Sequence, residues 1–127
     1  MKRDLKVDVT VDVLIKTWFD KDEGFWYASS PYVDVVQHGN TEKQALDRFK
    51  TVFEVLVSSS IRKGTILEIF KRSGYKVEID ESNGGNLRLN LTLPGRAIKS
   101  KSLGDWSSLI PWNKRIQETA GRELCRA

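Results

Sequence analysis

Acidic side chains are the most numerous groups in this sequence that could do chemistry. Asp8 and Asp12 fall on one side of an alternating stretch, and Asp20, Asp22 and Glu23 follow at its end. Nucleases that use two metal ions need such carboxylates to converge on one site. The solvent-facing side of a strand explains the first pair equally well, and a polar loop explains the other three. We therefore expect no metal site and no catalytic centre from these residues.

The other reactive residue types are too few to form a familiar site. His38 is the only histidine and Cys125 the only cysteine, so neither a two-histidine metal site nor a thiolate cluster can form. Ser29 and Ser30 lack the context of a nucleophile elbow. The glycines lack the spacing of a phosphate-binding loop. The sequence predicts a protein that is not an enzyme and has no cofactor.

The first forty residues have the pattern of three strands. Apolar residues occupy every second position from Leu5 to Ile15, which indicates a long strand with one dry and one wet face. The polar run 20–24 ends in glycine and suits a hairpin loop. Strands are expected at 25–29 and 32–36. Trp26 and Tyr27 should point to opposite faces, so one of them is exposed or contacts another subunit.

Helical spacing begins after this stretch. Thr41 and Gln44 form a capping box, and apolar residues from Ala45 to Leu56 make one stripe. A second capping box at Thr65 and Glu68 predicts a short helix, and residues 75–79 and 87–93 predict a β-hairpin. The expected fold class is α+β: an antiparallel three-stranded meander covered by one main helix, followed by a short helix and a hairpin.

The last third of the chain differs in character, so we expect two regions: an α+β domain at residues 1–93 and a basic, tryptophan-containing tail at 94–127. Residues 1–87 hold 13 Lys/Arg and 14 Asp/Glu, whereas residues 88–127 hold 8 and 3. Trp106, Ile110 and Trp112 form an apolar cluster in the tail. They could bind a partner protein or dock on the chain's own sheet. A short helix is expected after Asn113.

The basic residues of the tail suggest a second function. A module that binds nucleic acid would use cations beside Trp106 or Trp112, and its affinity would fall steeply with salt. The candidate cations are Arg96, Lys99, Lys101, Lys114 and Arg115. A solvated tail that keeps the chain soluble is the plainer explanation of the same charge.

The order of motifs between residues 5 and 60 resembles the HicB antitoxin family. The resemblance lies in the sequence Asp22-Glu23-Gly24-Phe25-Trp26-Tyr27-Ala28, then Pro31, then Gly39-Asn40-Thr41-Glu42-Lys43-Gln44-Ala45. Asn40 stands where that family usually has aspartate, and its Pro-Gly-Cys element between the second and third strands is absent here.

The resemblance implies a partial RNase H-like domain without the metal-binding carboxylates of that fold. It also implies a small HicA-like ribonuclease toxin as partner, whose active site the antitoxin masks. Members of the family assemble as homodimers or homotetramers, and many bind operator DNA. With no apolar run of eighteen residues and no signal peptide, we expect a cytoplasmic protein without a membrane span.

Overall fold

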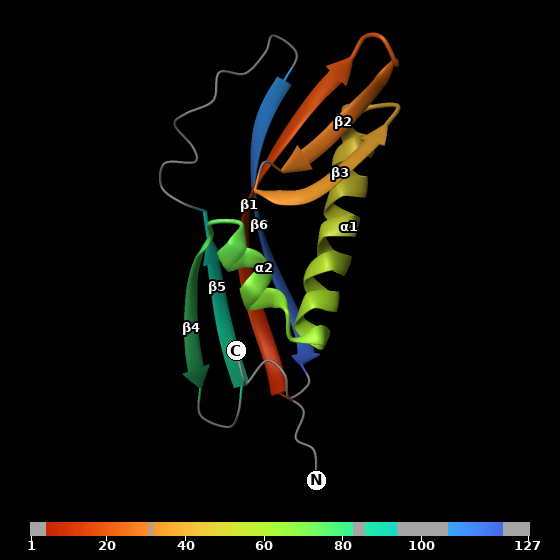
Figure 1. The fold of residues 1–127 in the computed structure, drawn as a ribbon. Coiled ribbons are helices and arrows are strands. Elements are labelled where there is room, and N and C mark those ends of the chain that lie inside the picture. Colours follow the sequence, from red (N-terminus) through yellow and green to blue (C-terminus); the bar gives the residue numbers. More distant parts are fainter. Residues whose placement is uncertain (1–4, 31, 83–85, 94–106, 121–127) are drawn as a thin grey trace.

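A long N-terminal strand is the axis of the fold in the computed structural model, which describes residues 5–30, 32–82, 86–93 and 107–120. Within these residues the chain is a mixed α/β fold with a six-stranded sheet and two helices (Figure 1). The elements are β1 (Leu5–Asp20), β2 (Phe25–Ser30), β3 (Val33–Gly39), α1 (Glu42–Lys63), α2 (Ile66–Arg72), β4 (Lys76–Ser82), β5 (Asn86–Thr92) and β6 (Ser107–Ala120).

Strand β1 pairs along both of its edges. One edge is divided: residues 6–11 pair with β5 in parallel, and residues 16–20 pair with β2 antiparallel. The other edge pairs with β6 antiparallel over nearly its whole length, from Leu5 opposite Ala120 to Trp18 opposite Ser107. The remaining strands extend the divided edge, in the order β3-β2-β1-β5-β4. The sheet therefore splits into two halves that share β1 and β6.

The predicted three-stranded meander is confirmed. β1 and β2 form an antiparallel pair, as do β2 and β3. The loop 20–24 is closed by Asp20, whose Oδ1 accepts hydrogen bonds from the backbone nitrogens of Asp22 at 2.9 Å and Glu23 at 3.2 Å. Gly24 takes a left-handed φ of 74° that other residues rarely adopt. Local turn chemistry thus sets the register of this hairpin.

Helix α1 begins at the predicted cap. The Thr41 hydroxyl accepts from the backbone nitrogen of Gln44 at 3.0 Å. The Gln44 side chain accepts from the nitrogen of Asn40 at 2.6 Å, one residue before the position a standard capping box uses. The helix continues through the serines at 58–60 to Lys63, because the buried Ser60 hydroxyl donates to the carbonyl of Val57. It ends at Gly64 with a φ of 75°.

The short helix and the second hairpin are also confirmed, but the cap predicted at Thr65 is wrong. The Thr65 side chain makes no capping hydrogen bond to α2. β4 and β5 pair antiparallel from Lys76 opposite Thr92 to Ser82 opposite Asn86. What the sequence did not predict is that β5 then lies parallel to β1, which is distant in the chain.

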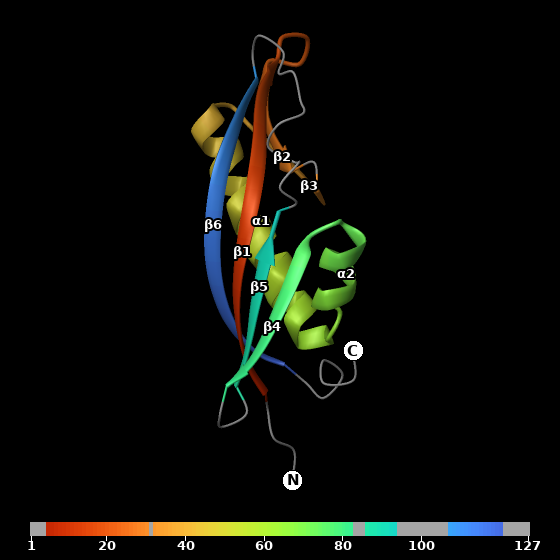
Figure 2. The same ribbon diagram turned by 90° about the vertical axis from the view of Figure 1, so that its left-hand side faces the viewer.

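Both helices pack on the same face of the sheet (Figure 2). The buried side of β1 carries Val7, Val9, Val11, Val13 and Ile15, all at most 1% exposed. Three fully buried phenylalanines, Phe49 and Phe53 of α1 and Phe70 of α2, cover this row. Full burial of such a side chain contributes roughly 1.5–3 kcal/mol. We call this the covered face; the opposite one, on which neither described helix packs, is the uncovered face.

The C-terminal region departs most from expectation. We predicted a basic tail from residue 94 with a short helix after Asn113, yet residues 107–120 form β6. This strand pairs with β1, so it belongs to the same sheet as residues 5–93. Pro111 lies within it, which hides the strand from sequence patterns because proline is usually confined to sheet edges.

Candidate protein-binding surface

The uncovered face of the sheet has two chemically different halves. Where β5 pairs with β1, the outward side chains are polar, including Asp8 and Thr10 of β1 with Arg88 and Asn90 of β5. Where β2 pairs with β1, they are aromatic. Strand alternation places Trp18 and Tyr27 opposite each other on this face, with Phe25 and His38 on the flanking positions.

The aromatic side chains form one connected surface. The rings of Trp18 and Tyr27 stack with centroids 5.4 Å apart. The ring centroid of His38 lies 5.9 Å from that of Tyr27 and 5.2 Å from that of Phe25. The ammonium of Lys16 lies 5.5 Å from the Trp18 ring. We call these five side chains the aromatic surface.

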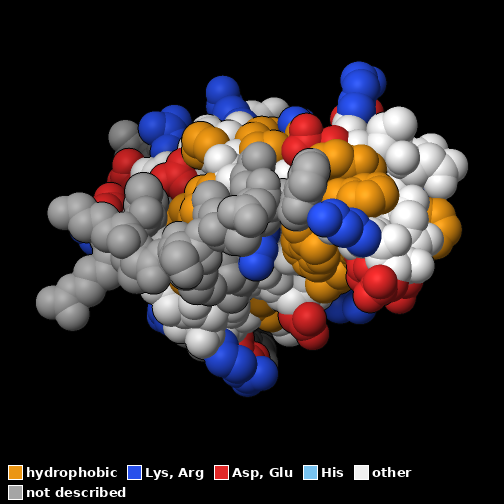
Figure 3. All heavy atoms as spheres, turned by 90° about the horizontal axis from the view of Figure 1, so that it is seen from above, with side chains coloured by type: hydrophobic (Ala, Val, Ile, Leu, Met, Phe, Trp, Pro, Cys, Tyr) orange, Lys and Arg blue, Asp and Glu red, His pale blue; other side chains and the backbone are white. Residues whose placement is uncertain are grey.

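None of the five is buried, and Val36 beside them on β3 is 53% exposed. Figure 3 shows hydrophobic side chains open to solvent at the end of the molecule that carries β2 and β3.

Carboxylates outnumber cations around the aromatic surface. Between Lys16 and Gly39 the chain has four acidic residues, Asp20, Asp22, Glu23 and Asp34, and two lysines. The Tyr27 hydroxyl donates a hydrogen bond to the Glu23 carboxylate. This bond, together with desolvation and the nearby negative charge, raises the pKa of Tyr27 above its ordinary value. The phenol thus stays neutral at physiological pH, within an acidic rim.

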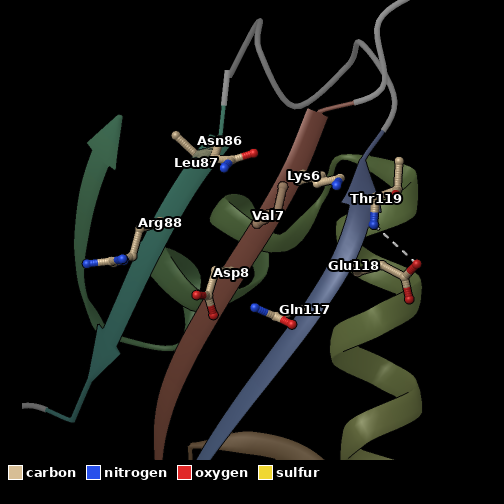
Figure 4. Close-up of a pocket in the computed structure, with 9 residues that line it drawn as sticks. All are labelled: Lys6, Val7, Asp8, Asn86, Leu87, Arg88, Gln117, Glu118 and Thr119. Carbon is tan, nitrogen blue, oxygen red and sulfur yellow. Dashed lines mark hydrogen bonds between the residues drawn. The ribbon is translucent and has the colours of Figure 1, made fainter. Parts of the chain in front are cut away.

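The polar half contains a hollow of about 470 Å³. Figure 4 shows side chains of β1, β5 and β6 around it, with Asp8 and Gln117 pointing toward one another on the side away from the helices. Arg115 donates two hydrogen bonds to Asp8, of 2.9 and 2.6 Å. These bonds hold the pKa of Asp8 below its ordinary value, against a smaller opposing effect of burial.

Acidic side chains of the polar half are held by neighbouring side chains. The hollow's lining includes no serine, cysteine or histidine that could act as a nucleophile or base. Asp8 is committed to Arg115, and Asp12 accepts a hydrogen bond from Asn113. In the part of the chain that the structure describes, no three His, Cys, Asp or Glu side chains gather as a metal site would require. An ion-paired, solvent-facing sheet surface accounts for these residues.

The predicted partner-binding residues lie on the other side of the sheet. Trp112 is on the covered face, where its ring meets Phe53 edge-on at 5.7 Å and the Lys50 ammonium lies 5.4 Å away. Ile110 is likewise packed against the core. Both are half-buried on their own sheet, the second of the two placements that the sequence left open, and partner binding by these residues stays a prediction. Trp106 lies outside the described residues.

Two of the predicted nucleic-acid contacts are engaged in ion pairs. Lys114 pairs with Glu54 of α1 at 3.0 Å, and Arg115 pairs with Asp8. A phosphate would have to compete with these carboxylates for both cations. Arg96, Lys99 and Lys101 lie outside the described residues.

The sequence pointed to only part of the aromatic surface. The opposite orientation of Trp26 and Tyr27 is confirmed: Trp26 packs against the core, and Tyr27 lies on the uncovered face. The predicted first strand ends at Ile15 and so leaves out Trp18, whereas Phe25 lies within the predicted strand 25–29 but was not singled out as part of a surface. Continuing the first strand's alternation to Asp20 would have placed Trp18 beside Lys16 on the wet side.

Comparison with known proteins adds no relative: no protein-family model, no curated protein and no solved structure matches this chain. Among the helices that the structure describes, none is both long and apolar enough to cross a bilayer.

Proposed function

We propose that this chain is a non-catalytic binding protein of the HicB-antitoxin kind, which acts in the cytoplasm by covering the active site of a small HicA-like ribonuclease. The order of its first elements supports the proposal. A three-stranded meander, closed by an acidic-glycine loop, leads through Gly39-Asn40-Thr41 into one long helix. The sequence motifs that resemble HicB antitoxins occupy these same elements.

The observation that carries the proposal is the aromatic surface on the uncovered face. Trp and Tyr are the side chains that most often dominate protein–protein binding energy, and they do so where they form a compact cluster. Stacked Trp18 and Tyr27, with Phe25 and His38 beside them, form such a cluster. No helix among the described residues packs over these rings, and accessible aromatic clusters of this kind often mark interaction sites.

The acidic rim indicates the charge of the partner. A ribonuclease must attract a polyanion, so the surface around its active site is basic. Asp20, Asp22 and Glu23 project from the loop beside the aromatic surface and complement such a partner. A phosphate backbone would be repelled by the same carboxylates, which disfavours this half of the sheet as a nucleic-acid platform.

Inhibition of RNA cleavage tests the proposal. The small basic protein encoded beside this chain should cleave RNA alone and lose that activity when wild-type chain is added in equimolar amount. The Trp18→Ala variant should need at least about tenfold more protein, because hot-spot residues contribute about 2 kcal/mol or more. Asn90→Ala, on the polar half of the same face, is the matched control and should inhibit like wild type.

Three results would contradict the proposal. One is the absence of a neighbouring reading frame for such a protein, and another is unimpaired inhibition by Trp18→Ala. The third is direct RNA or DNA binding by this chain with a steep salt dependence, which would support the basic-residue alternative instead.

A further inference from the structure

The outer edge of β6 is the longest open strand edge in the described part of the chain. β6 has 14 residues, and within residues 5–30, 32–82, 86–93 and 107–120 its only strand partner is β1. Helix α1 contacts β6 through side chains on the covered face, at Trp112, Lys114 and Glu118. A long open edge is a template for another strand.

Two observations show which residues of β6 direct their backbone N–H and C=O groups toward the open edge. The backbone carbonyl of Asp12 accepts from the Tyr75 hydroxyl on the divided edge of β1, so the even-numbered residues of β1 direct their backbone groups away from β6. The odd-numbered residues of β1 therefore bond to their partners in β6, which are even-numbered. The odd-numbered residues of β6 therefore direct their backbone N–H and C=O groups toward the open edge. Pro111 agrees with this, since its missing N–H is on the outward side.

We infer that the open edge of β6 pairs with β6 of a second copy, antiparallel and centred on Ile116, so that one sheet runs through a homodimer. In this register Asn113 lies opposite Thr119 of the second copy, and Arg115 lies opposite its Gln117. These are the outward-facing positions, and together they form about eight backbone hydrogen bonds. Pro111 lies beyond the paired segment, so its missing N–H interrupts nothing.

The charges on the covered side of β6 are complementary in this register. Lys114 lies opposite Glu118 of the second copy. Within one chain Lys114 pairs with Glu54 and Glu118 pairs with Arg62, each at 3.0 Å. Pairing two copies therefore produces an alternating row of four charges, Glu54, Lys114, then Glu118 and Arg62 of the second copy. Ile116, which is 8% exposed, meets its own copy at the symmetry axis.

Mass measurement in solution tests the inference. Light scattering on the purified chain should give twice 14.5 kDa for wild type. Gln117→Pro removes an outward N–H without touching the β1–β6 ladder, as Pro111 does naturally, and should give a folded monomer. Gln117→Ala removes the same side chain but keeps the N–H, and it should remain a dimer. A monomeric wild type, or a dimeric Gln117→Pro, would overturn the inference.

Cross-linking tests the register separately, even if Gln117→Pro does not fold. In a Cys125→Ser background, Asn113→Cys with Thr119→Cys should form a disulfide-linked dimer. Residues in such a pair lie about 5.5 Å apart between Cα atoms, which suits a disulfide. Within one chain the same positions are about 20 Å apart and cannot join. Asn113→Cys with Gln117→Cys is the control for a shifted register, and cross-linking there instead would overturn the proposed pairing.

Discussion

The Tyr75 hydroxyl donates a 2.7 Å hydrogen bond to the backbone carbonyl of Asp12, 63 residues earlier in the chain. This contact lies where the divided edge of β1 has no strand partner, between the segment that pairs with β5 and the segment that pairs with β2. A strand carbonyl removed from water needs a partner. Tyr75 supplies it, and its ring packs edge-on against Phe70 of α2 at 5.0 Å.

Removing this hydroxyl should destabilise the fold. We expect Tyr75→Phe to lower the free energy of unfolding by about 1–2 kcal/mol, because it leaves a partly buried carbonyl without its donor. Tyr27→Phe is the matched control: its hydroxyl bonds an exposed carboxylate, so the change should be much smaller than that of Tyr75→Phe. Urea unfolding monitored by circular dichroism measures both. Equal effects of the two variants would contradict this assignment.

The stabilities of the wild type and Tyr75→Phe should become more similar at alkaline pH. Burial raises the pKa of Tyr75 well above its ordinary value of 10.0. The unfolded chain therefore releases this proton first, and the wild type loses stability as pH rises above about 10. Tyr75→Phe has no such proton to release, so its stability deficit should shrink between pH 9 and 11. A constant deficit over this range would show that Tyr75 is accessible to solvent.

Arg115 should stabilise the fold only while Asp8 is ionised. We expect Arg115→Ala to lower stability only slightly at pH 7, since the pair is largely exposed. Because the pKa of Asp8 is lowered in the folded state, the loss should be present above about pH 4 and vanish as pH falls through that pKa. Urea unfolding at pH 7 and pH 2.5 checks this. A loss that persists at pH 2.5 would indicate packing rather than charge.

The two tryptophans on opposite faces should respond differently to truncation. Trp112→Ala is expected to lower unfolding stability by about 2–3 kcal/mol, because its ring fills the space between Phe53 and β6. Trp18→Ala should lower it by about 1 kcal/mol or less while reducing partner binding. Thermal unfolding of both variants distinguishes these roles. A Trp112→Ala variant that is stable but no longer binds the partner would support the predicted partner-binding role of Trp112.

Gly39 and Gly24 should be needed for different reasons. A Cβ at Gly39 would lie 2.7 Å from the backbone nitrogen of Ala45, so alanine forces β3 and α1 apart. We expect Gly39→Ala to lower stability by about 2–3 kcal/mol. Gly24 has open space around it and requires only a positive φ, so Gly24→Ala should lower stability by about 1 kcal/mol. Denaturant unfolding ranks the two, and the reverse order would contradict the close approach.

Local patterns predicted much of this fold. The alternation from Leu5, the loop before Gly24 and the cap at Thr41 each act within a few residues, and all three predictions are confirmed. The helix ran on past the serines because Ser60 satisfies its own hydroxyl within the helix. Composition alone could not predict this hydrogen bond.

Long-range pairing was not predictable in the same way. β6 finds its partner β1 about a hundred residues away, and neither Pro111 nor its charged residues identify it as a strand. The parallel contact of β1 with β5 is equally invisible, since nothing in the sequence of one strand specifies which edge it will occupy. The aromatic surface depends instead on the local pairings of β1 with β2 and of β2 with β3, which bring Trp18, Tyr27 and His38 together.

The measurement that tests the central proposal most directly is a hydrogen-exchange footprint of this chain with the small basic ribonuclease that the proposal expects as its partner. Backbone amides of β2 and β3, between Phe25 and His38, should exchange more slowly in the complex than in the chain alone. The polar half, from Asn86 to Thr92, should be unchanged. Protection of the polar half with β2 and β3 unaffected would show that the partner binds elsewhere and that the aromatic surface is not its binding site.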